Sequence, residues 1–130
     1  MATVTAAGAI AIEVPMQRFD DYVESAGLRG RIDLIKIDVE GWELPALHGG
    51  ASVFSAHDAP VIVLEFSAMN QRRAGFSADA LYRQLRDWGY TLYTGIEAEA
   101  LEPFAVHDAY SDSLNLVAVK QRRRDRLHLH

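Results

Sequence analysis

Residues 33–43, DLIKIDVEGWE, limit what this chain can fold into more than any other stretch. Residues 32–39 are nearly continuous apolar and β-branched, a pattern typical of a buried strand that is covered on both faces. Lys36 nevertheless lies in the middle of this strand. Three carboxylates follow at its end: Asp38, Glu40 and Glu43. Because charges cost desolvation energy unless something pairs with them, the stretch predicts a strand that delivers carboxylates to a site.

Length and composition narrow the class of protein. The chain has 130 residues, enough for one domain and too few for two. It contains no cysteine, which excludes disulfides, thiolate metal sites and cysteine nucleophiles within it. No segment approaches the ~20 apolar residues of a membrane span, and the N-terminus lacks the basic region of a signal peptide. We therefore predict a cytoplasmic protein with no membrane contact.

The net charge of −5 is unevenly distributed. Residues 120–130 carry +4, so the rest of the chain carries −9. An acidic body repels nucleic-acid backbones, and we predict no nucleic-acid partner. The basic end could touch RNA or a membrane surface, but short charged ends are usually frayed. We therefore predict a domain over residues 1–120 and a basic flexible tail over residues 121–130.

Apolar residues alternate between the period of a strand and the period of a helix along the chain. The predicted strands cover residues 9–16, 32–39, 61–66, 90–95 and 113–119. The predicted helices lie within residues 18–27, 40–54 and 76–89. This order predicts a three-layer α/β fold, a mostly parallel sheet with helices on both faces. No helix precedes the last strand, which we therefore expect to be antiparallel.

Ligands of open α/β sheets bind beyond the carboxyl ends of the strands. Asp38 ends one buried strand and Glu65 ends the next, so both should face one crevice if the strands are neighbours. Asp38 or Glu40 could instead cap the following helix, and Lys36 could pair with a carboxylate on the sheet. Glu65 interrupts an apolar strand where no cap is needed. Carboxylates gathered at one crevice could also hold a divalent cation, which we rank as the weaker alternative.

Residues 32–50, IDLIKIDVEGWELPALHGG, resemble the FkbM family of S-adenosylmethionine-dependent methyltransferases. The family segment K-I-D-V-E-G-x-E-x-x-x-L-x-G is matched from Lys36 to Gly49. PVIVLEFS resembles the next strand of the family, with Glu65 at its acidic position. MQRFDDYV resembles the strand-to-helix entry before the motif, and SDSLNLVAV resembles the closing strand. The resemblance covers roughly residues 10–120.

The resemblance implies a Rossmann-like class I methyltransferase fold and O-methylation of a sugar or other small-molecule hydroxyl. It suggests Asp38 and Glu65 as catalytic residues. Cofactor contacts with S-adenosylmethionine would come from Asp38, Glu40 and Gly41. Substrate contacts would come from Lys36, Trp42 and Glu43.

The sequence departs from the family in one respect. Family members carry a strand and a glycine-rich turn upstream of the motif, and no GxGxG occurs here. The chain therefore resembles the C-terminal half of a methyltransferase, in which strand 32–39 lacks a neighbour. An exposed edge of this kind predicts a homo-oligomer or a partner chain that covers the strand. The alternative to an enzyme is a non-catalytic module that associates through this edge.

Overall fold

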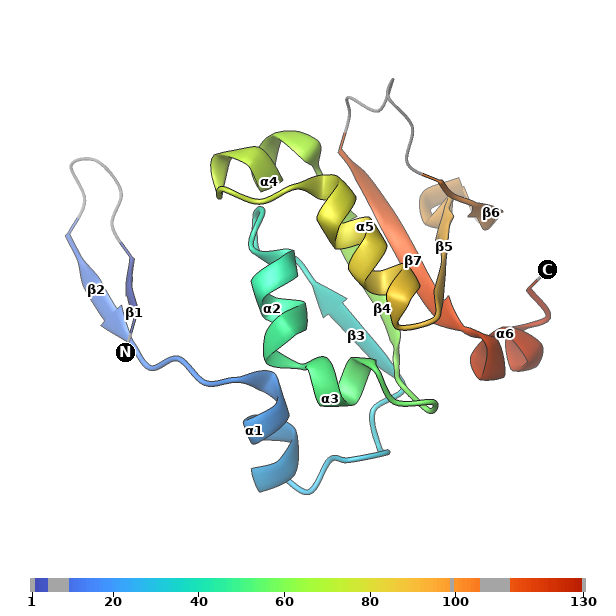
Figure 1. Cartoon of the computed structure of the whole chain (residues 1–130), viewed down its shortest axis with the longest axis horizontal. Helices are drawn as coiled ribbons and strands as arrows, with labels where there is room; N and C mark the ends of the chain where they lie inside the picture. Colours follow the sequence, from blue (N-terminus) through green and yellow to red (C-terminus); the bar gives the residue numbers. More distant parts are fainter. Residues whose placement is uncertain (1, 5–9, 99, 106–112, 130) are drawn as a thin grey trace.

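A computed structural model describes residues 2–4, 10–98, 100–105 and 113–129 (Figure 1). The strands are β1 (Ala2–Val4), β2 (Ile12–Val14), β3 (Leu34–Ile37), β4 (Val61–Phe66), β5 (Tyr90–Thr94), β6 (Glu102–Pro103) and β7 (Leu114–Lys120). The helices are α1 (Phe19–Ser25), α2 (Glu43–Gly49), α3 (Ala51–Phe54), α4 (Ala68–Arg73), α5 (Ala78–Asp87), α6 (Gln121–Leu127) and the 3₁₀ turn η1 (Ile96–Ala98). None of the described helices is long and apolar enough to cross a membrane.

The central sheet has five strands in the order β3-β4-β7-β5-β6. β3 and β4 are parallel, while β7 lies between β4 and β5 and is antiparallel to both. β3, β4 and β5 therefore run in one direction, and the predicted antiparallel last strand is confirmed. The short β6 pairs with the free side of β5. The result is a mixed α/β sheet of the Rossmann-like kind.

One face of this sheet carries the main core. In β4 the side chains alternate, so that Ile62, Leu64 and Phe66 are buried on the helical side. The helices α1, α2, α3 and α5 supply the opposing layer, in which Leu47 and Leu85 are fully buried. Such alternation arises because successive strand residues point to opposite faces. This layer fixes the loops that leave β3 and β4.

The second face of the sheet is covered unevenly. Val117 and Val119 of β7 are buried beneath Leu101 and Leu129, which follow η1 and α6 in the chain. Toward β3 this cover ends, and the Leu34 side chain is 61 % exposed. The prediction that strand 32–39 is covered on both faces is therefore wrong.

The position of β3 explains its charge. β3 is the edge strand of the sheet and, in the described part of the chain, pairs only with β4. Ile35 and Ile37 face the helices, whereas Lys36 lies on the open face and is exposed. The strand is therefore amphipathic by alternation, and Lys36 requires no buried partner.

The N-terminal strand is shorter than predicted and is not part of the central sheet. Of the predicted strand 9–16 the structure describes residues 10–16, and of these Ile12–Val14 form a strand, β2. β2 pairs with β1 in an antiparallel hairpin that is separate from the central sheet. Figure 1 shows this hairpin projecting from the body of the molecule.

Three polar caps position the helices. Ser77 accepts a hydrogen bond from the Ala80 N–H and begins α5, as the sequence predicts. Ser67 caps α4 in the same way through the Asn70 N–H, although α4 was not predicted. Asp20 of α1 accepts bonds from the Ser52 and Val53 N–H groups, and so caps α3 from another helix.

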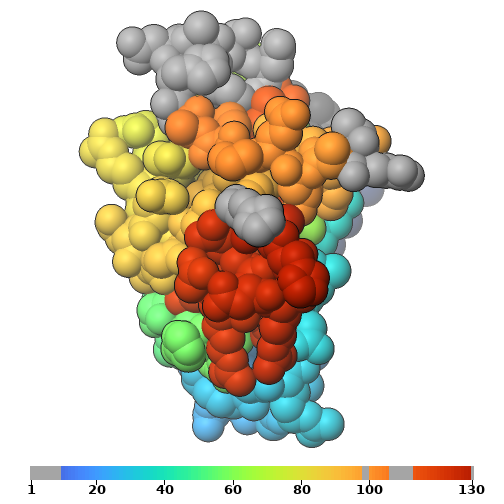
Figure 2. All heavy atoms as spheres, turned by 90° about the vertical axis from the view of Figure 1, so that its right-hand side faces the viewer, coloured from blue at the N-terminus to red at the C-terminus, as the bar shows by residue number. Residues whose placement is uncertain are grey.

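The C-terminal segment also differs from the predicted frayed tail, because residues Gln121–Leu127 form α6. The Arg123 guanidinium donates to the carbonyl oxygens of Ala59, Asp58 and Ile32 at 2.8–3.2 Å. It also pairs with the Asp33 carboxylate at 3.1 Å. Figure 2 shows the red atoms of this segment packed against earlier parts of the chain. Arg123 thus ties α6 to the loops before β3 and β4, and Arg124 of the same helix donates to the Thr91 hydroxyl of β5 at 3.3 Å.

Candidate functional site

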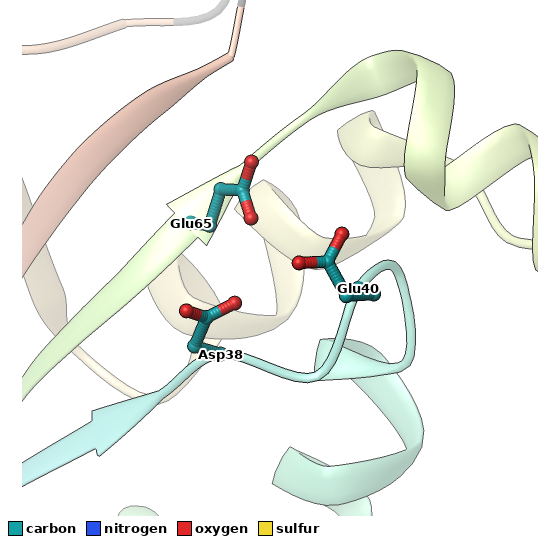
Figure 3. A group of neighbouring side chains, drawn as sticks. All are labelled: Asp38, Glu40 and Glu65. Atoms are coloured by element: carbon teal, nitrogen blue, oxygen red, sulfur yellow. The ribbon is translucent and has the colours of Figure 1, made fainter.

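Three carboxylates converge where β3 and β4 end (Figure 3). Asp38 follows β3 directly, Glu40 lies two residues further on, and Glu65 is the next-to-last residue of β4. One oxygen of each carboxylate lies within 4.8 Å of the others. The parallel register of β3 and β4 brings these strand ends together. Asp38 and Glu65, which were predicted to face one site if the two strands are neighbours, therefore lie close together.

The backbone of the turn after β3 aims the Glu40 side chain. Glu40 adopts a left-handed conformation with φ of 51°, which is uncommon for a residue other than glycine. Gly41 follows with φ of 102°, and a Cβ there would lie 2.3 Å from the Asn70 carbonyl oxygen. The Asn70 side-chain amide donates to the Glu40 carboxylate at 3.0 Å. Only glycine at position 41 permits this close contact between the turn and α4.

Glu43 belongs to the interior. It is 1 % exposed and accepts hydrogen bonds from the Val39 and Gly41 N–H groups, both at 3.3 Å. Its other oxygen accepts from the Gln71 side-chain amide. These bonds hold the turn closed beneath the exposed carboxylates. A substrate contact, as predicted for Glu43, would require the carboxylate to leave all three donors.

The contacts do not support the two structural alternatives, helix capping by Asp38 or Glu40 and pairing of Lys36 with a carboxylate. Trp42 is the N-cap residue of α2, and no side chain caps that helix. Asp38 and Glu40 are therefore not its caps. Lys36 makes no ion pair with a carboxylate in the described residues. Of the two exposed acidic residues of the turn, Asp38 accepts no hydrogen bond within the described residues, and Glu40 accepts one, from Asn70.

Trp42 supplies an apolar surface beside the turn. Its ring is 55 % exposed and contacts the Phe76 ring edge-on, with centroids 5.3 Å apart. Lys36 lies one residue before the end of β3, on the open face of the sheet. Neither of these two predicted substrate residues belongs to the group of three carboxylates.

Ser113 is a site residue that sequence reasoning missed. Its hydroxyl donates to the Glu65 carboxylate. Asn115 lies opposite Glu65 in the β4–β7 register, and its amide donates to Glu97 at 2.5 Å. The predicted antiparallel last strand was only part of the signal needed, because its pairing with β4 was not predicted.

The described residues also form an open cleft of about 310 Å³ at the opposite end of the sheet. Its lining includes His57, Lys120 and Arg122, and none of the three carboxylates. The carboxylates instead stand on an open rim, where Asp38 and Glu40 are exposed and Glu65 is half-buried. We place the candidate site at the rim because hydrogen-bonding capacity and charge gather there.

A family model for the methyltransferase FkbM domain matches residues 3–92. The match includes β3, the turn with Asp38 and Glu40, and β4 with Glu65. No curated protein and no solved structure matches the chain. Since the matched segment covers more than half of the 130 residues, the chain belongs to the FkbM methyltransferase family.

Proposed function

We propose that this protein is an S-adenosylmethionine-dependent O-methyltransferase that acts on a small-molecule or sugar hydroxyl. The observation that carries the proposal is the convergence of Asp38, Glu40 and Glu65 at the carboxyl ends of two parallel strands. Family membership supplies the reaction class. The position of the carboxylates supports the ends of β3 and β4 as the site of this reaction.

The donor set fits this cofactor in part. S-adenosylmethionine carries a positively charged sulfonium and ribose hydroxyls, and carboxylates attract the first and accept hydrogen bonds from the second. Asp38 and Glu40 would hold it. Gly41 has no side chain and its N–H donates to Glu43, so it would contact the cofactor only through its remaining backbone atoms. No GxGxG turn occurs in the sequence to extend the cradle.

The bound cofactor would supply an electrophilic methyl group. The task left to this chain is to orient the acceptor hydroxyl and take its proton. Glu65 suits that role, since the Ser113 hydroxyl fixes one of its oxygens and leaves the other to accept. Asp38 is the second candidate base. The exposed Trp42 ring would pack against the apolar part of the acceptor.

Two alternative functions rest on other observations. The unpaired edge of β3 favours a non-catalytic module that associates with another polypeptide. The three carboxylates, with oxygens within 4.8 Å of one another, favour a divalent cation. The titration below separates binding of the methyl donor from binding of a cation.

The test is calorimetric titration of the folded chain with S-adenosylmethionine, S-adenosylhomocysteine and Mg²⁺. We expect saturable binding of both adenosyl compounds, lost in Asp38→Asn, with the melting temperature retained. Asp21→Asn is the matched control, because Asp21 is exposed on α1 and outside the rim. Absence of binding at millimolar concentration would contradict the proposal. Binding of Mg²⁺ alone would support the cation site instead.

A further inference from the structure

Among the described strands with a free edge are β2 of the hairpin and β3 of the central sheet. β2 pairs on one side with β1, and β3 pairs on one side with β4; neither has a second neighbour in the described part of the chain. Free edges expose backbone N–H and C=O groups that can pair with another strand. A two-stranded hairpin alone is marginally stable in water, so β1–β2 in particular needs cover.

The apolar side chains of the hairpin strand β2 and its flanking residues are also exposed. Residues at every second position from 10 to 16 form an exposed apolar row: Ile10, Ile12, Val14 and Met16. Their exposed fractions are 89, 62, 41 and 75 %. A period of two places all four on one side of an extended strand. The projecting hairpin therefore carries an apolar row that the described part of the chain leaves exposed.

The two edges are complementary in pattern and in charge. β2 reads Ile12-Glu13-Val14, and β3 contains Ile35-Lys36-Ile37. Each is apolar, charged, apolar, and the charges are opposite. Pairing with Glu13 opposite Lys36 would place the charges together on the open face. Ile12 and Val14 would then extend the apolar side formed by Ile35 and Ile37. Opposite charges and β-branched pairs at facing positions both stabilise a sheet.

We propose that two copies of this chain associate by exchanging their hairpins, so that β2 of each copy pairs with β3 of the other in the Glu13–Lys36 register. The exchange is reciprocal and closes as a two-fold dimer, which covers the free edges of β2 and β3 in each copy. It extends the five-stranded sheet by the hairpin strands of the partner. This inference does not depend on methyl transfer.

The test uses the chain of 130 residues and measures its mass in solution over a range of concentrations. The wild type should be a dimer. Glu13→Lys and Lys36→Glu each place like charges at both junctions of a dimer, so each should weaken dimerisation at least about tenfold. The double variant should restore it. Arg73→Glu, an exposed charge reversal on α4, is the control and should have no effect.

Mixing the two single variants gives a sharper result. A Glu13→Lys chain and a Lys36→Glu chain are each repelled by their own kind, yet in a mixed dimer both junctions join opposite charges. We expect the equimolar mixture to dimerise as strongly as the wild type, with circular dichroism confirming that each variant is folded. A monomeric wild type, or a dimer unchanged in both single variants, would overturn the proposal. Failure of the mixture to dimerise would also overturn it.

Discussion

The two ends of the central sheet carry opposite charges and are stabilised differently. At the amino end of β4, Arg123 bonds three carbonyl oxygens and one carboxylate. Lys120 donates to the Ala56 carbonyl at 2.7 Å and lies 5.0 Å from the centroid of the Tyr90 ring. At the carboxyl end, three carboxylates face one another with few donors between them.

This difference separates structural from functional charge. Arg123 and Lys120 at the amino end are satisfied by groups of the chain itself. Burial lowers the pKa of the Lys120 ammonium, although the nearby Asp58 opposes the shift. The exposed carboxylates at the other end repel one another, and a cationic or hydroxyl-rich ligand would relieve that repulsion. Beneath them Glu43 is the exception, a carboxylate that is buried and fully engaged.

The largest expected loss of stability follows from removing the buried Glu43 carboxylate. Glu43→Ala leaves the Val39 and Gly41 N–H groups and the Gln71 amide without an acceptor, and should lower the free energy of unfolding by about 4 kcal/mol. Chemical denaturation measures it. Glu40→Ala, at the exposed neighbour, should cost less than about 1 kcal/mol. Equal losses for the two variants would contradict the division between buried and exposed carboxylates.

A milder substitution sharpens the same point. The Gln71 side-chain oxygen is buried and has no partner in the described residues. In Glu43→Gln the Gln71 amide can rotate so that this oxygen accepts from the new side chain. This variant should therefore lose less than about 1.5 kcal/mol, far less than the alanine.

The next largest loss of stability is expected at the amino end of β4, where Arg123 binds. Arg123→Ala removes the donors that join α6 to the loops before β3 and β4, and should lower the free energy of unfolding by about 2 kcal/mol, because water can reach some of the freed carbonyls. Arg122→Ala is the matched control, since Arg122 is exposed on the same helix. A loss as large in the control would mean that the total basic charge of α6, rather than the Arg123 contacts, stabilises this end.

The smallest effect concerns Asp20 and depends on pH. Burial alone would raise the pKa of this carboxyl, but the bonds from Ser52 and Val53 outweigh it and hold the pKa below its usual 3.8. The ionised form is favoured in the folded state, so its contribution is present above pH 3.8 and is lost as the pH falls through the lowered pKa.

Thermal unfolding from pH 6 to pH 2 measures this contribution. Asp20→Asn should lose about 1 kcal/mol at pH 6 and approach the stability of the wild type at pH 2. A difference that stays constant across this range would show that charge is not the reason Asp20 stabilises α3.

The sequence predicts those elements whose signals are local. VIVLEF became β4 without a shift of boundary, and Ser77 begins α5 as its capping chemistry indicates. The helix α4 was missed because AMNQRR lacks an apolar period, although Ser67 was a usable cap signal. The predicted two-sided cover of strand 32–39 failed because apolar composition does not reveal whether a strand lies at an edge.

The candidate site was predictable in part for the same reason. The predicted ends of two strands were enough to predict that Asp38 and Glu65 lie close together. The interior position of Glu43 was not predictable, since it depends on Gln71, a residue of the missed helix. Ser113 reaches Glu65 only because β7 inserts beside β4, a long-range pairing that no local pattern specifies.

The close contact between Gly41 and Asn70 has a consequence for how this protein can evolve. With the position of a Cβ only 2.3 Å from a backbone carbonyl of α4, neither the turn nor that helix can change its path alone. A substitution at position 41 becomes acceptable only together with a displacement of residues 67–71, which also carry the Glu40 and Glu43 partners. Segments thirty residues apart in the chain are therefore inherited as one unit, and we expect their substitutions to covary.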